Sequence, residues 1–171
     1  MEPKRHSKEK MLLHKLGSFP QNIATNHYLE NLSEFVLHEL CSQDLFNLPK
    51  AAYLVNNPDF KCLKGVAGYD DKHAFNAGVN WQKHKEFTSH MKQSPFNQKV
   101  RLMYDSALSK HDENEMYALA DVLEIEHPVY HIWDMKHENQ GIFIYEKPES
   151  FDETHEHLIQ FVPMLSFCPV F

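Results

Sequence analysis

The chain has 171 residues, of which 42% are hydrophobic and 24% are charged. These proportions are typical of a folded globular domain and argue against intrinsic disorder, and the length is sufficient for one hydrophobic core. The three cysteines, Cys41, Cys62 and Cys168, include no CxxC pair, which excludes a disulfide framework and a thiolate zinc site. No apolar run approaches the roughly 18 residues that a membrane helix needs. The basic N-terminus lacks the apolar core of a signal peptide, so we expect a cytoplasmic protein with no membrane partner.

The formal net charge is −7, and the charges are unevenly distributed along the chain. Residues 83–110 carry six Lys or Arg and two acids, whereas residues 111–157 carry two basic residues and thirteen acids. An acidic surface repels phosphate backbones. We therefore expect no nucleic-acid partner.

The first part of the chain predicts a helix. Residues 1–21 are polar and basic, and they indicate either a frayed lead-in or the first turns of a helix. Residues 22–46 place apolar side chains at three-and-four spacing, which predicts one long amphipathic helix with Asn22 or Thr25 as its cap. We therefore place the lead-in at residues 1–21 and a single domain at residues 22–171.

The middle of the chain alternates short apolar runs with turn signals. Residues 51–55 and 60–66 are separated by a turn and predict a β-hairpin. Residues 69–97 are the least regular part of the chain, with one helix expected at residues 80–92. Residues 99–107 alternate apolar and polar side chains, which predicts a strand.

The last third of the chain predicts a helix followed by a second hairpin. Asp112 or Asn114 can cap a helix with an apolar stripe. The runs at residues 128–135 and 141–145 are rich in β-branched and aromatic residues, and a polar stretch separates them. These two runs predict two antiparallel strands.

The end of the chain predicts a closing helix. A capping-box signature at residues 150–153 opens it, and Pro163 should bend this helix or end it early. Strands joined by hairpins imply antiparallel pairing, and amphipathic helices at the two ends need a shared sheet face. The sequence therefore predicts an α+β fold with one central antiparallel sheet flanked by N- and C-terminal helices.

Two stretches of the chain resemble GAF-type small-molecule sensor domains. The run KAAYLVNNPDFKCLKGVAGYD looks like the opening hairpin of that family, and QGIFIYEKPESFDETHEHLIQFVPMLSF looks like its last strand and closing helix. The resemblance covers about residues 22–167. It implies a non-enzymatic ligand-binding or regulatory domain that forms a homodimer through its first and closing helices and signals to a downstream protein. One enzymatic branch of the family reduces free methionine sulfoxide, but the three cysteines do not reproduce its cysteine motifs.

The expected ligand site is an aromatic pocket at the sheet. Its expected residues are Tyr69, His73, Phe75, Trp81, Tyr104, His131 and Trp133. Aromatic rings with polar ends suit a small organic ligand, because the rings bury area and the polar tips orient it; the alternative is that most of them are core. Side chains alternate along a strand, so His131 and Trp133 share one face, which we favour as pocket lining, while Tyr130 and Asp134 share the other. We expect the ligand to order residues 69–97 and to alter helix packing.

Thirteen histidines raise the alternative of a small metal-dependent enzyme. Its metal ligands would be His131, Asp134 and His137, where imidazole and carboxylate groups converge from one hairpin. No HExxH or GxSxG motif accompanies them, so we assign no catalytic residue and leave the cofactor open. A third alternative is a protein-interaction adaptor with an exposed apolar patch on its first helix.

Overall fold

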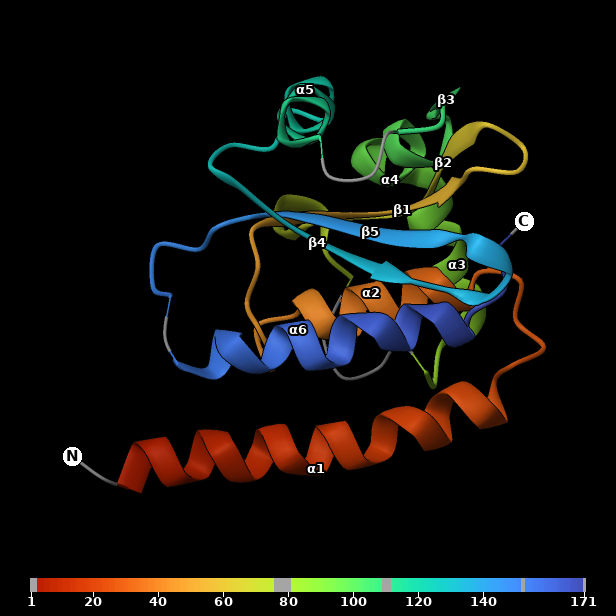
Figure 1. Ribbon diagram of the computed structural model, residues 1–171. Helices are drawn as coiled ribbons and strands as arrows, with labels where there is room; N and C mark the ends of the chain where they lie inside the picture. Colours follow the sequence, from red (N-terminus) through yellow and green to blue (C-terminus); the bar gives the residue numbers. More distant parts are fainter. Residues whose placement is uncertain (1–2, 76–80, 109–111, 152, 171) are drawn as a thin grey trace.

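The computed structural model describes residues 3–75, 81–108, 112–151 and 153–170 (Figure 1). Its helices are α1 (Pro3–Thr25), α2 (Leu32–Cys41), α3 (His84–Gln93), α4 (Pro95–Arg101), α5 (Glu113–Val122) and α6 (Leu158–Phe161). Its strands are β1 (Lys50–Asn57), β2 (Cys62–Asp70), β3 (Tyr104–Ser106), β4 (Pro128–Asp134) and β5 (Gln140–Glu146). Short 3-10 helices are η1 (Asp71–His73), η2 (Lys136–Glu138), η3 (Glu153–His157) and η4 (Val162–Phe167). No helix in these ranges is both long and apolar enough to cross a membrane.

The strands of the described ranges form one antiparallel sheet in the order β3-β2-β1-β5-β4. β1 is the central strand, paired with β2 on one side and with β5 on the other. The hairpins β1–β2 and β4–β5 therefore lie side by side, and β3 and β4 form the two edges. This arrangement confirms the predicted α+β class, the central antiparallel sheet and both predicted hairpins.

Helices cover both faces of this sheet (Figure 1). On one face, Tyr53 of β1 and Phe143 of β5 pack with α1, α2 and the C-terminal helical segment. On the opposite face, Leu54 and Ile142 pack with α4 and α5. Neighbouring residues reach opposite cores because side chains alternate along a strand. Leu54 and Phe143 are fully buried, and burial of such a side chain stabilises the fold by roughly 1.5–3 kcal/mol.

The helix α4 lies along the part of β2 that β3 leaves unpaired. The N–H of Gly65 donates to Met103 O at 2.9 Å, and the N–H of Gly68 donates to Asn97 Oδ1 at 2.9 Å. Gly65 allows this close approach, because a Cβ at that position would lie 1.7 Å from Val100 O. The helix and the residues after it therefore accept hydrogen bonds that a neighbouring strand would otherwise accept.

The prediction of one helix over residues 22–46 is wrong, because the chain turns between α1 and α2. At this turn, the backbone N–H and the side-chain Nδ2 of Asn26 both donate to Asn22 O, at 3.0 and 2.8 Å. α2 is buried on nearly every side, since it lies between α1 and the sheet (Figure 1). α1 also buries Leu12 and Phe19 in the same core, so the predicted lead-in contributes a helix to the fold.

The strand predicted at residues 99–107 is also wrong over its first half, where the chain is in α4. Pro95 lies in the first turn of this helix, where its fixed φ is favourable and its missing N–H costs nothing. Val100 is fully buried, whereas Leu102 and Tyr104 are 84% and 72% exposed. The apolar alternation of these residues therefore does not correspond to one buried strand face, and only the three residues of β3 remain.

The predicted cap of α5 is confirmed. The carboxylate of Asp112 accepts hydrogen bonds from the N–H groups of Asn114 and Glu115, at 2.9 and 3.4 Å. The predicted helix at residues 80–92 corresponds to α3, which begins at His84.

The closing helix is confirmed only in shortened form. α6 has four residues and gives way to η4 at Val162, where Pro163 lies in the first turn. Pro163 therefore ends the α-helix early, as predicted. The capping box predicted at residues 150–153 includes Asp152, which lies outside the described residues.

Candidate functional site

A dense group of aromatic and titratable side chains lies where α2, η1 and α3 meet, at the end of β2. We call this group the aromatic–histidine cluster. Its members are Phe35, His38, Tyr69, Phe75, Trp81, Phe87 and His90. They come from a helix, the end of a strand, a loop and a second helix, so the cluster exists only when these elements have packed together.

The rings of the cluster form a fully buried layer and a partly exposed layer. Phe35 and Phe87 are fully buried and lie 4.2 Å apart between ring centroids. Trp81 stacks on Phe35 at 5.2 Å, and the ring of Phe75 meets Phe87 edge-on at 5.6 Å. Trp81 and Phe75 are only half-buried. The cluster therefore presents two partly exposed rings on top of a fully buried aromatic layer.

His38 lies in the interior of the cluster. Its ring meets those of Tyr69 and Phe87 edge-on, at centroid distances of 5.1 and 5.2 Å. Its Nε2 accepts a hydrogen bond from the backbone N–H of Phe75 at 2.9 Å. Burial lowers the pKa of His38 to about 4, with a further contribution from the nearby His90. The ring is therefore neutral at pH 7, as an acceptor at Nε2 requires.

Polar groups surround the exposed side of the cluster. The indole N–H of Trp81 donates to the carboxylate of Glu39. Burial raises the pKa of the Glu39 carboxyl, and the hydrogen bond from Trp81 opposes that rise. On the other side, the ring of His90 contacts the backbone carbonyl of His73, whose own ring lies 3.7 Å from the Asp70 carboxylate. The cluster thus combines apolar rings with two carboxylates and two imidazoles at its edge.

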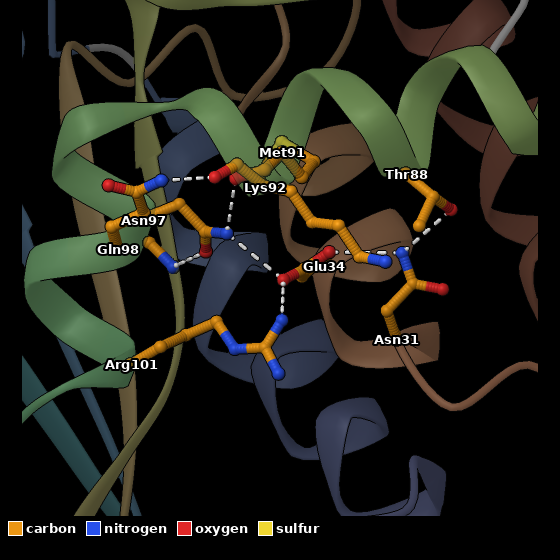
Figure 2. A network of polar contacts seen from close by, with 9 residues as sticks. Asn31, Glu34, Thr88, Met91, Lys92, Asn97, Gln98 and Arg101 are labelled. Atoms are coloured by element: carbon orange, nitrogen blue, oxygen red, sulfur yellow. Dashed lines mark hydrogen bonds and ion pairs between the residues drawn. The ribbon is translucent and has the colours of Figure 1, made fainter.

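A buried polar network holds the helices around the cluster in place (Figure 2). Its centre is Glu34 of α2, which is 2% exposed. Glu34 Oε1 accepts from Asn97 Nδ2 at 3.0 Å and from Arg101 NH1 at 2.7 Å, both on α4. Glu34 Oε2 accepts from Asn31 Nδ2, which also reaches Thr88 Oγ1 of α3 at 3.1 Å. Satisfied buried networks of this kind fix the relative position of the elements that they join.

The structure brings four of the predicted ligand-site residues to this cluster. Tyr69, Phe75 and Trp81 belong to it, and His73 lies at its edge. Sequence reasoning missed the α2 and α3 contributions, of which His38 is the most informative. On a helix, an aromatic residue and a histidine three positions apart indicate only a buried face, so no local signal identifies them as part of a site.

The other three predicted residues lie elsewhere. Tyr104 is on the edge strand β3 and is largely exposed. His131 and Trp133 do share one face of β4, with their rings stacked at 6.0 Å. Trp133 also stacks on Tyr53 at 5.8 Å. These contacts place the His131 and Trp133 pair over the β4 side of the sheet, whereas the cluster lies at the end of β2.

The three residues considered as metal ligands do not form a group. His131 and Asp134 lie three positions apart on β4, on opposite faces of the strand, and His137 follows in η2. Within the described part of the chain, no three His, Cys, Asp or Glu side chains are close enough together to hold a metal ion. The hairpin therefore provides no support for the metal-enzyme alternative.

A cavity of about 80 Å³ lies between α1 and the loop after α2. Lys8 and Met11 line it from α1, and Phe46 and His155 line it from the opposite side. The ring of His155 is held by the carbonyl of Phe46, with Nε2 at 2.8 Å from the oxygen. A cavity of this size has room for a few waters, whereas pockets for organic ligands measure about 300–1,000 Å³.

The comparisons with protein-family models, with curated proteins and with solved structures found no match for this chain. The cluster itself places partly exposed rings next to polar groups. Half-exposed rings provide a surface on which a flat molecule can stack, and the flanking carboxylate and imidazoles provide hydrogen-bonding groups that can orient it.

Proposed function

We propose that this protein is a non-enzymatic, GAF-like regulatory domain that binds a small organic molecule at the aromatic–histidine cluster. One observation carries this proposal: Trp81 and Phe75 are half-exposed while they rest on the fully buried rings of Phe35 and Phe87. Large apolar rings that remain partly exposed while they pack on buried rings are typical of binding surfaces.

The polar groups around the rings define the chemistry of the ligand. The Glu39 carboxylate already accepts the Trp81 N–H, so it orients the indole and retains lone pairs for a second donor. His90 provides a ring nitrogen on the opposite side, next to Phe75 at a centroid distance of 5.4 Å. A flat, mostly apolar molecule with a hydrogen-bond donor at one end and a polar group at the other fits this arrangement.

The regulatory part of the proposal follows from where the cluster lies. Its rings come from α2 and α3 as well as from the end of β2, so a ligand that touches Trp81 and Phe75 stabilises one packing of α3 against α2. A ligand shifts an equilibrium only by its difference in affinity for the two states. Hydrogen exchange of the backbone amides of α3 should therefore slow when the ligand binds.

The test uses protein purified without added ligand, first by native mass spectrometry and then by fluorescence. The chain has two tryptophans, so the Trp133→Phe variant reports on Trp81 alone, and Trp81→Phe is the matched control. We expect an organic molecule retained by the wild type, or one found by titration with planar organic fragments, to change the Trp81 emission. The same molecule should leave the emission of the Trp81→Phe variant unchanged.

A second variant pair separates binding from folding. Trp81→Ala should abolish binding, whereas Tyr104→Ala, at a largely exposed position on the edge strand β3, should bind as the wild type does. The proposal is contradicted if no mass is retained and no fragment changes the Trp81 emission, or if Trp81→Ala binds normally.

A further inference from the structure

The strand β4 forms an open edge of the sheet. It is the outermost strand beyond β5 (Figure 1), and its seven residues pair with β5 in one continuous register, from Pro128 opposite Glu146 to Asp134 opposite Gln140. All residues of β4 before Asp134 are half-buried. β4 is therefore a regular, largely apolar edge strand.

The hydrogen bonds at the two ends of the hairpin show which backbone groups point outward. Lys147 N donates to His127 O at 3.2 Å, and Met135 N donates to Asn139 O at 2.8 Å. Hydrogen-bonded and non-hydrogen-bonded pairs alternate along an antiparallel ladder, so the odd-numbered residues of β4 bond to β5. The N–H and C=O groups of Tyr130, Ile132 and Asp134 consequently face away from the sheet.

This edge lacks the usual protection against pairing. Natural edge strands are kept short, bulged, charged or covered. The β4 register contains no bulge, its one proline is the first residue, and its one charged carboxylate, Asp134, is the last. Between them, residues 129–133 read Val-Tyr-His-Ile-Trp, with side chains of high strand propensity on both faces.

We propose that β4 pairs antiparallel with β4 of a second copy of this chain, with a two-fold axis at His131, so that the two sheets join into one. Antiparallel pairing opposes outward-facing residues with outward-facing residues. Three registers keep most of the strand paired, with the axis at Tyr130, His131 or Ile132. The side chains distinguish between them.

With the axis at His131, both faces of the joint carry favourable pairs. Tyr130 lies opposite the partner's Ile132, and Val129 lies opposite the partner's Trp133, each pair occurring twice. Aromatic residues opposite β-branched residues stabilise a sheet by roughly 0.2–1 kcal/mol per pair. This register also pairs all seven residues of β4, because His131 is the middle residue of the strand.

The other two registers lose these features. With the axis at Tyr130, only residues 128–132 are paired, so Trp133 has no residue opposite it. With the axis at Ile132, only residues 130–134 are paired, and Tyr130 lies opposite the partner's Asp134 instead of a β-branched residue. The register centred on His131 therefore pairs the most residues and keeps the aromatic–β-branched pairs, so we favour it.

The first experiment measures the mass of the full chain in solution by light scattering at high micromolar concentration. We expect a dimer for the wild type and a monomer for His131→Glu, because the substitution places two carboxylates opposite each other at the axis. Tyr104→Glu, at the exposed position on the other edge of the sheet, should remain a dimer. Thermal melting by circular dichroism checks that each variant is folded.

A second experiment tests the register. In a Cys62→Ser background, His131→Cys should form an intermolecular disulfide under mild oxidation, because residues that face each other in a non-hydrogen-bonded pair lie about 4.5 Å apart. Ile132→Cys is the matched control, since its diagonal distance to the partner's residue 132 is about 7–8 Å, beyond the usual disulfide range.

The results can overturn the proposal in three ways. If the wild-type chain is monomeric at high micromolar concentration, self-pairing is rejected. The β4 edge would then be available to a strand of a different protein. A dimer that His131→Glu does not dissociate lies on another surface. Faster cross-linking of Ile132→Cys than of His131→Cys rejects the register.

Discussion

The two edges of the sheet differ in whether their outward-facing backbone groups are hydrogen-bonded. At the β2 edge, β3 pairs with only three residues, and beyond them Asn97 and Met103 accept the N–H groups of Gly68 and Gly65. At the β4 edge, the outward N–H groups of Tyr130 and Ile132 find no acceptor among the described residues. The comparison shows that an edge can be closed by a helix as well as by a strand, provided that the sequence supplies a glycine and a suitable side chain.

The largest expected effect comes from a substitution that displaces α4 from β2, at the edge that this helix closes. In Gly65→Ala, the new Cβ would lie 1.7 Å from the carbonyl oxygen of Val100, so the helix must move and its bonds to β2 must break. We expect a loss of about 4 kcal/mol or more in the free energy of unfolding, a size that point mutations reach only exceptionally. Urea denaturation measures this loss.

Gly17→Ala is the control for that substitution. Gly17 lies within α1 and has no atom within 4 Å of the position of an added Cβ. Alanine should therefore stabilise the protein by about 1 kcal/mol, because it has the higher helix propensity. A similar loss in both variants would show that α4 is not held against β2 by close contact.

The open edge at β4 predicts that proline substitutions at two neighbouring positions differ in their cost to stability. His131→Pro removes an N–H that bonds to β5, so it should cost about 3 kcal/mol. Ile132→Pro removes an N–H that points away from the sheet, a position that tolerates proline on an edge strand, and should cost about 1 kcal/mol from lost packing. Chemical denaturation of the dilute, monomeric proteins measures both. Equal costs would contradict the assignment of Ile132 as an outward-facing residue.

Acid should weaken the closed side of the sheet, where His38 contacts Tyr69 at the end of β2. The pKa of His38 is lowered from 6.5 to about 4 by burial, so the unfolded chain binds a proton at a higher pH than the folded chain does. The stabilisation is therefore complete above about pH 6.5 and is lost as the pH falls toward 4. Between pH 7 and pH 5 the loss should be about 2 kcal/mol.

This pH dependence is measured by urea denaturation at several pH values, with the His38→Gln variant as the control. Glutamine can offer its carbonyl oxygen to the Phe75 N–H but does not titrate in this range. The slope between pH 5 and pH 7 should therefore decrease in the variant. An unchanged slope would show that another group is responsible.

Much of the fold could be predicted because its signals are local. The β1–β2 and β4–β5 hairpins follow from apolar runs on either side of a turn, and the α5 cap follows from Asp112. The strand predicted at residues 99–107 failed because Val100 and Leu102 alternate with polar residues by coincidence. Only their tertiary environment, against β2 for Val100 and in solvent for Leu102, shows that they are not on one strand face.

The candidate site was predictable in part for the same reason. Tyr69, Phe75 and Trp81 lie close together in the sequence and stand out as aromatic residues in an irregular segment. His38 and Phe87 complete the cluster from two helices, and only the packing of α2 against α3 places them there. Tyr104 does lie on a strand, but β3 is a three-residue edge strand on which this side chain is largely exposed, away from the cluster.

The indole of Trp133 gives the protein an internal optical reporter. It covers Gly141 on the neighbouring strand, stacks on Tyr53 with an interplanar angle of 14°, and donates its N–H to Ser166 Oγ at 2.6 Å. At this separation, light absorbed by the Tyr53 phenol should be re-emitted by Trp133. Detachment of the C-terminal segment that carries Ser166 would then shift the wavelength of the Trp133 emission before the sheet itself unfolds.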